Sequence, residues 1–340
     1  MLEKILFGTY TKKTSQGIYQ AVLDTNQGRC FDLKLAIKVS NPTYLQVTPA
    51  KQLFTVAKKE NQGGIEQFSL VTLAKSLVTS SLTVGAPPCY VGFDQARNLI
   101  FTANYHTALV QIFKANGEQP MHFLSEKKFF GQGPRPEQEE SHTHYADLTP
   151  DGRLAVCDLG ADRVYTFTIS VTGTLTHQQI FATRPGFAPR HLVFHPNQKT
   201  AFLVGELSSQ VAVLNYEPQT GTFKQIQQIA TIPTDWKKHN GAAAIKISAD
   251  GKFIYASNRG HDSIAVFAWQ NHQLKLIQLA KTYGSFPRDF AIDPSGKYLL
   301  VANQESDNAT LFERSTVTGK LNCRQKDILV PEGVCVKFID

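Results

Sequence analysis

The sequence lacks the features that identify several common classes of protein. No stretch approaches the roughly 18 consecutive apolar residues of a membrane-spanning helix, and the first residues, MLEKILFGTYTKK, have no long apolar segment of the secretory type. No GxSxG, HExxH, EF-hand, phosphate-binding glycine loop or dinucleotide fingerprint occurs. We therefore expect neither a serine hydrolase nor a nucleotide-dependent enzyme, and we expect a cytoplasmic protein without a membrane anchor.

Paired cysteines and basic runs are also lacking. The five cysteines form an odd set without a CxxC motif, which is typical of free thiols in a reducing compartment. The formal net charge is +7, yet no run of five basic residues exists to follow a nucleic-acid backbone. The excess positive charge suits a small anionic substrate better, so we expect no nucleic-acid or membrane partner.

What the sequence does contain is a repeat. Only 2 methionines accompany 22 phenylalanines and 11 tyrosines, a composition that favours strands. An apolar strand, a turn rich in Pro, Asp and Gly, a second apolar strand, a polar tip and a third strand recur every 45 to 54 residues. The second strands end at Gly8, Ala57, Ala103, Cys157, Gly205, Ser257 and Ala302.

The first of these seven modules is split between the two ends of the chain. Ile5–Gly8 has the pattern of a second strand, and Pro331–Phe338 has the pattern of a first strand. Short strands with a period near fifty indicate a propeller rather than a sandwich. The sequence therefore predicts an all-β, seven-bladed β-propeller forming one domain over residues 1–340, with its ring closed by pairing of the N- and C-terminal strands.

Polar residues gather where second strands end and where first strands begin. In a propeller these segments share one face, so the topology predicts that residues distant in sequence converge there. The candidates are His142, His144, Arg190, Glu206, Arg259, His261, Arg288 and Gln304.

The polar residues at the tips are compatible with several functional and structural roles. His142 and His144 can act as a base, bind substrate, form half of a metal site completed by Glu206 or Asp158, or be satisfied by backbone groups. Glu206 can act as a general base or acid, or form a salt bridge to an arginine.

Arginines at the same tips suit anion recognition. Arg190 and Arg259 can bind a carboxylate or phosphate, stabilise an oxyanion, or pair with carboxylates between blades. Arg288 repeats the Pro-Arg sequence of Arg190. Asp158, Asp162 and Arg163 are expected to pin their loop.

The motifs SHTH, TPDGRLAVCDLGADRVYTF, PRHLVFHP, LVGEL, YASNRGHDSIAVF and PRDFAIDPSGKYLLVANQESDN resemble those of the seven-bladed propeller lactonase family. That family includes propeller-type 6-phosphogluconolactonases and carboxymuconate lactonizing enzymes. The resemblance spans nearly the whole chain. It implies opening or closure of a lactone without an obligatory metal or organic cofactor.

The resemblance also implies site residues. The family histidine corresponds to His142 or His144, and its remaining active-site residues correspond to Arg190, Glu206 and Arg259. We accordingly expect His142, His144, Glu206 and Arg259 to be catalytic. Substrate-binding roles are expected for Arg190, Arg288, His261 and Gln304.

The expected reaction is hydrolysis of a sugar-acid lactone, with 6-phosphogluconolactone as the first candidate, by a monomer or weak homo-oligomer. The alternatives are a cycloisomerase acting on a carboxylated diene acid, a propeller that only binds partners, and a calcium-dependent lactonase. The last would use oxygens from Asn104, Asn258 and Asn303.

Overall fold

The computed structural model describes residues 1–71 and 76–339. Within these residues the secondary structure is 28 β-strands and one 3-10 helix, η1 (Pro136–Gln138). The chain forms two compact units. The first unit comprises Met1–Val39, His191–Asn215 and Gln225–Asp340, and the second comprises Ser40–Arg190 and Tyr216–Lys224.

The first unit contains three complete four-stranded sheets. The sheet β28-β1-β2-β3 consists of β28 (Gly333–Ile339), β1 (Leu2–Thr9), β2 (Gly17–Asp24) and β3 (Arg29–Lys38). The next consists of β20 (Gly241–Ile247), β21 (Phe253–Arg259), β22 (Ser263–Gln270) and β23 (Gln273–Lys281). The third consists of β24 (Pro287–Ile292), β25 (Tyr298–Asn303), β26 (Asn308–Arg314) and β27 (Leu321–Leu329).

The second unit also contains three sheets. One consists of β4 (Leu45–Val47), β5 (Gln52–Lys59), β6 (Gln62–Ser69) and β7 (Leu77–Val84). Another consists of β8 (Tyr90–Asp94), β9 (Leu99–Asn104), β10 (Leu109–Asn116) and β11 (Gln119–Lys128). The third consists of β12 (Thr143–Leu148), β13 (Leu154–Asp158), β14 (Arg163–Ile169) and β15 (Leu175–Ala182). A seventh sheet has the order β16 (Pro189–Phe194), β17 (Thr200–Gly205), β18 (Gln210–Glu217) and β19 (Thr222–Ala230).

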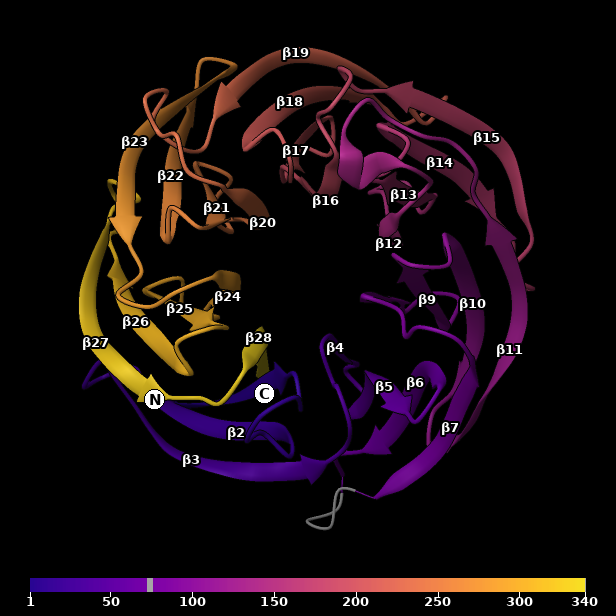
Figure 1. The fold of residues 1–340 in the computed structure, drawn as a ribbon, viewed down its shortest axis with the longest axis horizontal. Helices are drawn as coiled ribbons and strands as arrows, with labels where there is room; N and C mark the ends of the chain where they lie inside the picture. The colour runs from indigo at the N-terminus through magenta and orange to yellow at the C-terminus, as the bar shows by residue number, and fades with distance from the viewer. Residues whose placement is uncertain (72–75, 340) are drawn as a thin grey trace. The chain divides into compact units, whose positions relative to one another are not determined.

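These seven sheets are the seven blades of a β-propeller, which confirms the predicted fold class. The predicted closure is also confirmed, because β28 pairs antiparallel with β1, with Phe7 opposite Val336 (Figure 1). The two ends of the chain thus complete one sheet and leave no open edge at β1.

The fourth strand of each blade was not predicted from the sequence. The repeat indicated three strands, and the structure adds β3, β7, β11, β15, β19, β23 and β27. In β15 no side chain is buried, whereas in β13 every side chain is buried. A strand that buries so little carries no apolar alternation, which is the signal that identifies a strand.

The core lies between neighbouring sheets. In the first unit, Phe202 and Val204 of β17 pack with Ile254 of β21 and Phe267 of β22, all fully buried. Every residue of β17 is buried, so this strand reads as a continuous apolar run rather than an alternating one. This packing fixes where the strands end, and the polar tips begin at the next residues of the chain.

Candidate functional site

Two β-bulges place candidate residues at the same point of two blades. We call the strand that begins each sheet order (β4, β8, β12, β16, β20, β24 or β28) the lead strand. In lead strand β12 the register shifts between Thr143 and Tyr145, so His144 is the extra residue. In lead strand β24 it shifts between Pro287 and Asp289, so Arg288 is the extra residue. Bulges redirect side chains and are common beside functional sites.

Aspartates at equivalent turns pin the loops that lead into these strands. The Asp162 carboxylate accepts the N–H of Ala188 at 2.7 Å, and the Asp262 carboxylate accepts the N–H of Phe286 at 2.8 Å. Ala188 has φ 59° and Phe286 has φ 64°, conformations that non-glycine residues seldom adopt. The expectation that Asp162 pins its loop is confirmed. Each pinned residue lies two positions before an arginine, Arg190 or Arg288.

In the first unit, Glu206 and Arg259 form an ion pair. Arg259 Nη2 lies 2.9 Å from Glu206 Oε1, and the two side chains are 8% and 19% exposed. Each residue directly follows or ends a second strand, β17 or β21. The structure thus realises the salt bridge that the sequence left as one of two roles for Glu206.

Arg259 is held from several directions. Its Nε donates to Gly241 O at 3.1 Å, its Nη2 donates to Ala242 O at 3.4 Å, and its Cζ lies 5.2 Å from the Phe286 ring centre. A Cβ at Gly241 would lie only 2.9 Å from Arg259 Nη2, so a larger residue there would displace the guanidinium. Within the described residues, Nη1 has no hydrogen bond, which leaves one face of the guanidinium available to a ligand.

The candidates Gln304 and His261 also lie in the first unit. Gln304 N donates to Phe286 O at 3.1 Å, so Gln304 adjoins the loop that contacts Arg259. His261 Nδ1 lies 2.7 Å from Ser263 Oγ, and its ring lies edge-on to Trp236 at 4.7 Å. Burial lowers the pKa of His261, so the neutral imidazole is favoured there.

In the second unit, His142 is fixed in one tautomer. Its Nδ1 lies 2.8 Å from the carbonyl oxygen of Tyr105, which can only accept, so Nδ1 carries the proton. Nε2 of the neutral ring then holds the lone pair, 3.8 Å from Glu139 Oε2. The imidazole also stacks on the Tyr105 ring at 4.1 Å. This arrangement is competent for proton acceptance at Nε2.

His144 and Asp158 complete this group. His144 is 4% exposed and lies edge-on to Tyr105 at 6.2 Å, so both histidines contact one ring. The Asp158 carboxylate accepts the N–H groups of His142 at 2.9 Å and Ala161 at 3.1 Å, which confirms its predicted structural role. Burial raises the pKa of Asp158, and these hydrogen bonds oppose that shift.

Arg190 lies in β16 and is 2% exposed. It follows Pro189 as Arg288 follows Pro287, so the two blades share the Pro-Arg sequence at this point.

No group of three or more His, Cys, Asp or Glu side chains suited to a metal ion occurs among residues 1–71 and 76–339. Two of the three asparagines of the calcium alternative use their side-chain oxygens locally, whereas Asn303 Oδ1 is buried without a hydrogen-bond partner among the described residues. Asn104 Oδ1 accepts from His106 N and Thr107 N at 3.1 Å, and Asn258 Oδ1 accepts from Thr231 Oγ1 at 2.6 Å. In the described part of the chain, no helix is long and apolar enough to span a membrane.

Sequence reasoning missed the aromatic partners. Tyr10 and Tyr105 occupy the same tip position as Glu206, Arg259 and Gln304, directly after or at the end of a second strand. The repeat could have identified them, but a search for titratable groups passes over tyrosine rings that act as platforms.

A family model described as "Lactonase, 7-bladed beta-propeller" matches residues 4–338. A protein named 6-phosphogluconolactonase from Bacillus subtilis strain 168 is 38% identical over 339 residues, covering 98% of this chain and 97% of the relative. A crystal structure of a protein from Lactobacillus plantarum is 48% identical, with a TM-score of 0.98 and full coverage of both chains. The structure of a periplasmic gluconolactonase from Pseudomonas aeruginosa is 29% identical, with a TM-score of 0.93, covering 100% of this chain and 99% of that chain.

Proposed function

Because this chain belongs to the seven-bladed β-propeller lactonase family, we propose that it hydrolyses 6-phosphogluconolactone to 6-phosphogluconate. Family membership supports lactone hydrolysis, and the Bacillus subtilis relative supports the phosphorylated substrate. The structural observation that carries the proposal is the Glu206–Arg259 ion pair, which combines a carboxylate with a firmly held guanidinium. The product places the enzyme in the pentose phosphate pathway.

In the proposed reaction, the Glu206 carboxylate accepts a proton from water as the water oxygen bonds to the lactone carbonyl carbon. Arg259 Nη1 donates to the carbonyl oxygen as it becomes negatively charged. The ring C–O bond then breaks, and the ring oxygen takes the proton from the Glu206 carboxyl group to become the hydroxyl of the product, which restores the carboxylate. General-base catalysis supplies roughly 10²–10⁴-fold and one oxyanion donor about 10²–10³-fold. A lactone that also opens spontaneously needs no covalent nucleophile.

The test is hydrolysis of freshly generated 6-phosphogluconolactone, followed with 6-phosphogluconate dehydrogenase. The wild type should exceed the spontaneous rate with or without chelator. Glu206→Gln and Arg259→Ala should each lower kcat by about 10²- to 10³-fold. Arg324→Ala is a matched control and should retain the wild-type rate, because Arg324 makes an exposed 3.9 Å ion pair with Glu313 and an exposed 3.4 Å hydrogen bond to Gln27 O.

No excess over the spontaneous rate would overturn the substrate assignment, and carboxymuconate cyclisation would be measured next. His142 is the alternative base. A loss in His142→Gln, with Glu206→Gln still active, would move the base to the second unit.

We also propose that the protein acts in the cytoplasm. The five cysteines are all free thiols, as expected for a reducing compartment. Cell fractionation tests this, since the Pseudomonas aeruginosa relative is described as periplasmic.

A further inference from the structure

Two cations of the first unit lie on one tyrosine ring. Lys12 Nζ is 4.3 Å from the ring centre of Tyr10, and Arg288 Cζ is 5.6 Å from the same centre. Each contact is a favourable cation–π interaction. The two distances limit the separation of the two positive charges to at most about 10 Å, a range over which they repel each other. An anion between or beside them would remove that repulsion.

In the part of the chain that the structure describes, no acidic side chain provides this anion. Within the described residues, neither Lys12 nor Arg288 forms an ion pair, although nearby cations do. Lys13 pairs with Glu305 at 3.7 Å, and Arg259 pairs with Glu206. Lys12 is exposed and Arg288 is half-buried, so both remain accessible to a ligand.

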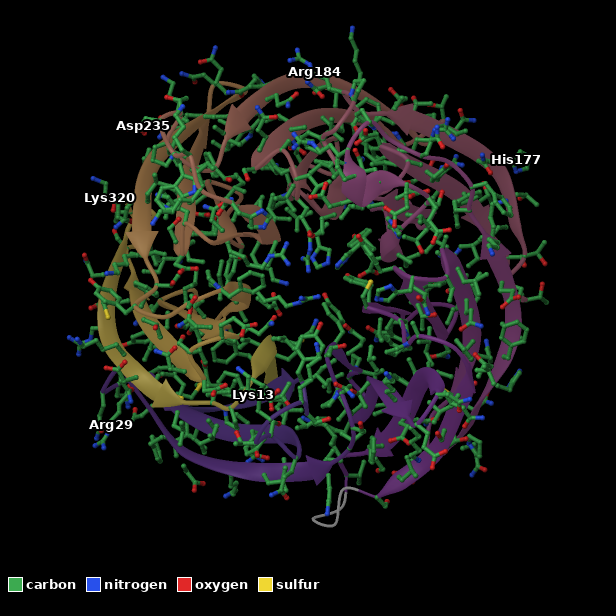
Figure 2. All side chains as sticks on the ribbon, in the orientation of Figure 1. Lys13, Arg29, His177, Arg184, Asp235 and Lys320 are labelled. Atoms are coloured by element: carbon green, nitrogen blue, oxygen red, sulfur yellow. The ribbon has the colours of Figure 1, made fainter. Side chains whose placement is uncertain are left out.

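The loop that carries Tyr10 and Lys12 is preformed. The Glu332 carboxylate accepts four consecutive backbone N–H groups, those of residues 12 to 15, at 2.9–3.1 Å. Tyr10 N donates to Glu332 O at 3.0 Å, and Glu332 is itself 3% exposed. Figure 2 shows Lys13 of this loop close to β28, the strand that follows Glu332. The loss of conformational entropy on ordering this loop therefore occurs when the protein folds and not when a ligand binds.

The backbone around Arg288 is also held in place. It is the bulged residue of β24, and it lies two positions after Phe286, whose N–H is held by Asp262. The Phe286 ring stacks on Arg259. One short segment thus contacts the proposed catalytic pair through Phe286 and presents a second, unpaired guanidinium through Arg288.

We propose that Lys12 and Arg288, supported by the Tyr10 ring, form the subsite for the phosphomonoester of the lactone substrate. This inference rests on the proposed function, because it names the part of that substrate which the subsite binds. The planar guanidinium can bind two phosphate oxygens at once, and the ammonium adds a compact charge. The subsite therefore selects a phosphorylated sugar lactone over the unphosphorylated one.

The test compares kcat/KM for 6-phosphogluconolactone with kcat/KM for gluconolactone. In Lys12→Gln and in Arg288→Gln, the ratio of the two should fall by about 10- to 100-fold. Arg288→Lys should lose less, because it retains the charge. Lys13→Gln is the matched control and should keep the wild-type ratio. Thermal unfolding of each variant verifies that the fold is intact. An unchanged ratio in Lys12→Gln and Arg288→Gln overturns the subsite.

A second measurement separates the subsite from the proposed function. Calorimetry should show that the wild type binds 6-phosphogluconate more tightly than gluconate, and that both Gln variants lose this preference. If neither lactone is hydrolysed, the proposed function fails and binding alone decides the subsite. Equal binding of the two acids by the wild type, or an undiminished preference in both Gln variants, would overturn it.

Discussion

The blade that carries His144 and the blade that carries Arg288 share a backbone and differ in their surroundings. In each, a bulge in the lead strand inserts one extra residue opposite the same two positions of the next strand. His144 is 4% exposed beside Tyr105, whereas Arg288 is half-buried over Tyr10. The repeat therefore fixes where a side chain emerges, and its neighbours determine whether it is buried or available to a ligand.

Exchanging the side chains of His144 and Arg288 should show the difference between the two blades most strongly. His144→Arg places a guanidinium in a buried position, and we expect a loss of about 3–5 kcal/mol in unfolding free energy. Arg288→His should cost less than about 1 kcal/mol, because the position is partly exposed. Urea unfolding of both variants measures the difference. Similar losses would show that the two sites are equally closed.

The second-strand residue opposite each bulge offers a sharper contrast. Asp158 in β13 and Asn303 in β25 occupy equivalent positions. Asp158→Ala removes the acceptor of two buried N–H groups and should cost about 1–3 kcal/mol. Asp158→Asn keeps an acceptor oxygen and should cost much less.

The pH dependence follows from the same group. Burial raises the pKa of Asp158 above its ordinary 3.8, so the folded protein binds this proton more tightly than the unfolded chain. That contribution to stability is complete below pH 3.8 and is lost as pH rises through the folded pKa. Asp158→Asn should lack this loss when urea midpoints are compared from pH 4 to 8. A parallel profile in both proteins would contradict the assignment.

The pinned residues before Arg190 and Arg288 should respond differently to glycine. Ala188→Gly relieves the cost of a positive φ and should change stability by less than about 1 kcal/mol, toward greater stability. Phe286→Gly gives the same backbone relief but removes the ring that contacts Arg259. We expect kcat/KM to fall about 3- to 10-fold in Phe286→Gly alone. Equal kinetics in the two variants would argue against a role for the ring.

The smallest effect concerns His261 in the β20–β23 blade. Its pKa is lowered below 6.5 by burial, so the unfolded chain takes up a proton first as the pH falls. Its contribution to stability is present above pH 6.5 and is lost as pH falls through that range. His261→Gln should therefore lose less stability than the wild type between pH 7.5 and 5.5. His239→Gln, at an exposed position, should follow the wild type.

The sequence predicted the backbone of the blades better than the partners at their tips. Apolar runs separated by Pro, Asp and Gly turns identify β13 and its neighbours, because these strands are buried on both faces. Exposed strands such as β15 leave no such pattern. The split module was predictable because its two halves each retain a complete strand pattern.

The roles of the site residues were harder to predict. Glu206 and Arg259 are far apart in sequence, and only the packing of the β16–β19 blade against the β20–β23 blade brings them to 2.9 Å. The sequence therefore left ion pair and base as alternatives for Glu206. The tautomer of His142 depends on the carbonyl of Tyr105, which no side-chain pattern reveals. The cations on Tyr10 depend on a loop held by Glu332, a residue from the other end of the chain.

That contact has a consequence during protein synthesis. Lys12 leaves the ribosome early, but the carboxylate that shapes its loop is translated 320 residues later. At 5–20 residues per second, the delay is roughly 15–65 s. Throughout this time β1 lacks its partner β28, and the nascent N-terminal segment needs protection from wrong pairing. A ribosome that stalls before Glu332 would release a chain that contains the other six blades. In that chain the proposed phosphate subsite cannot form. The subsite therefore forms only after translation has passed Glu332.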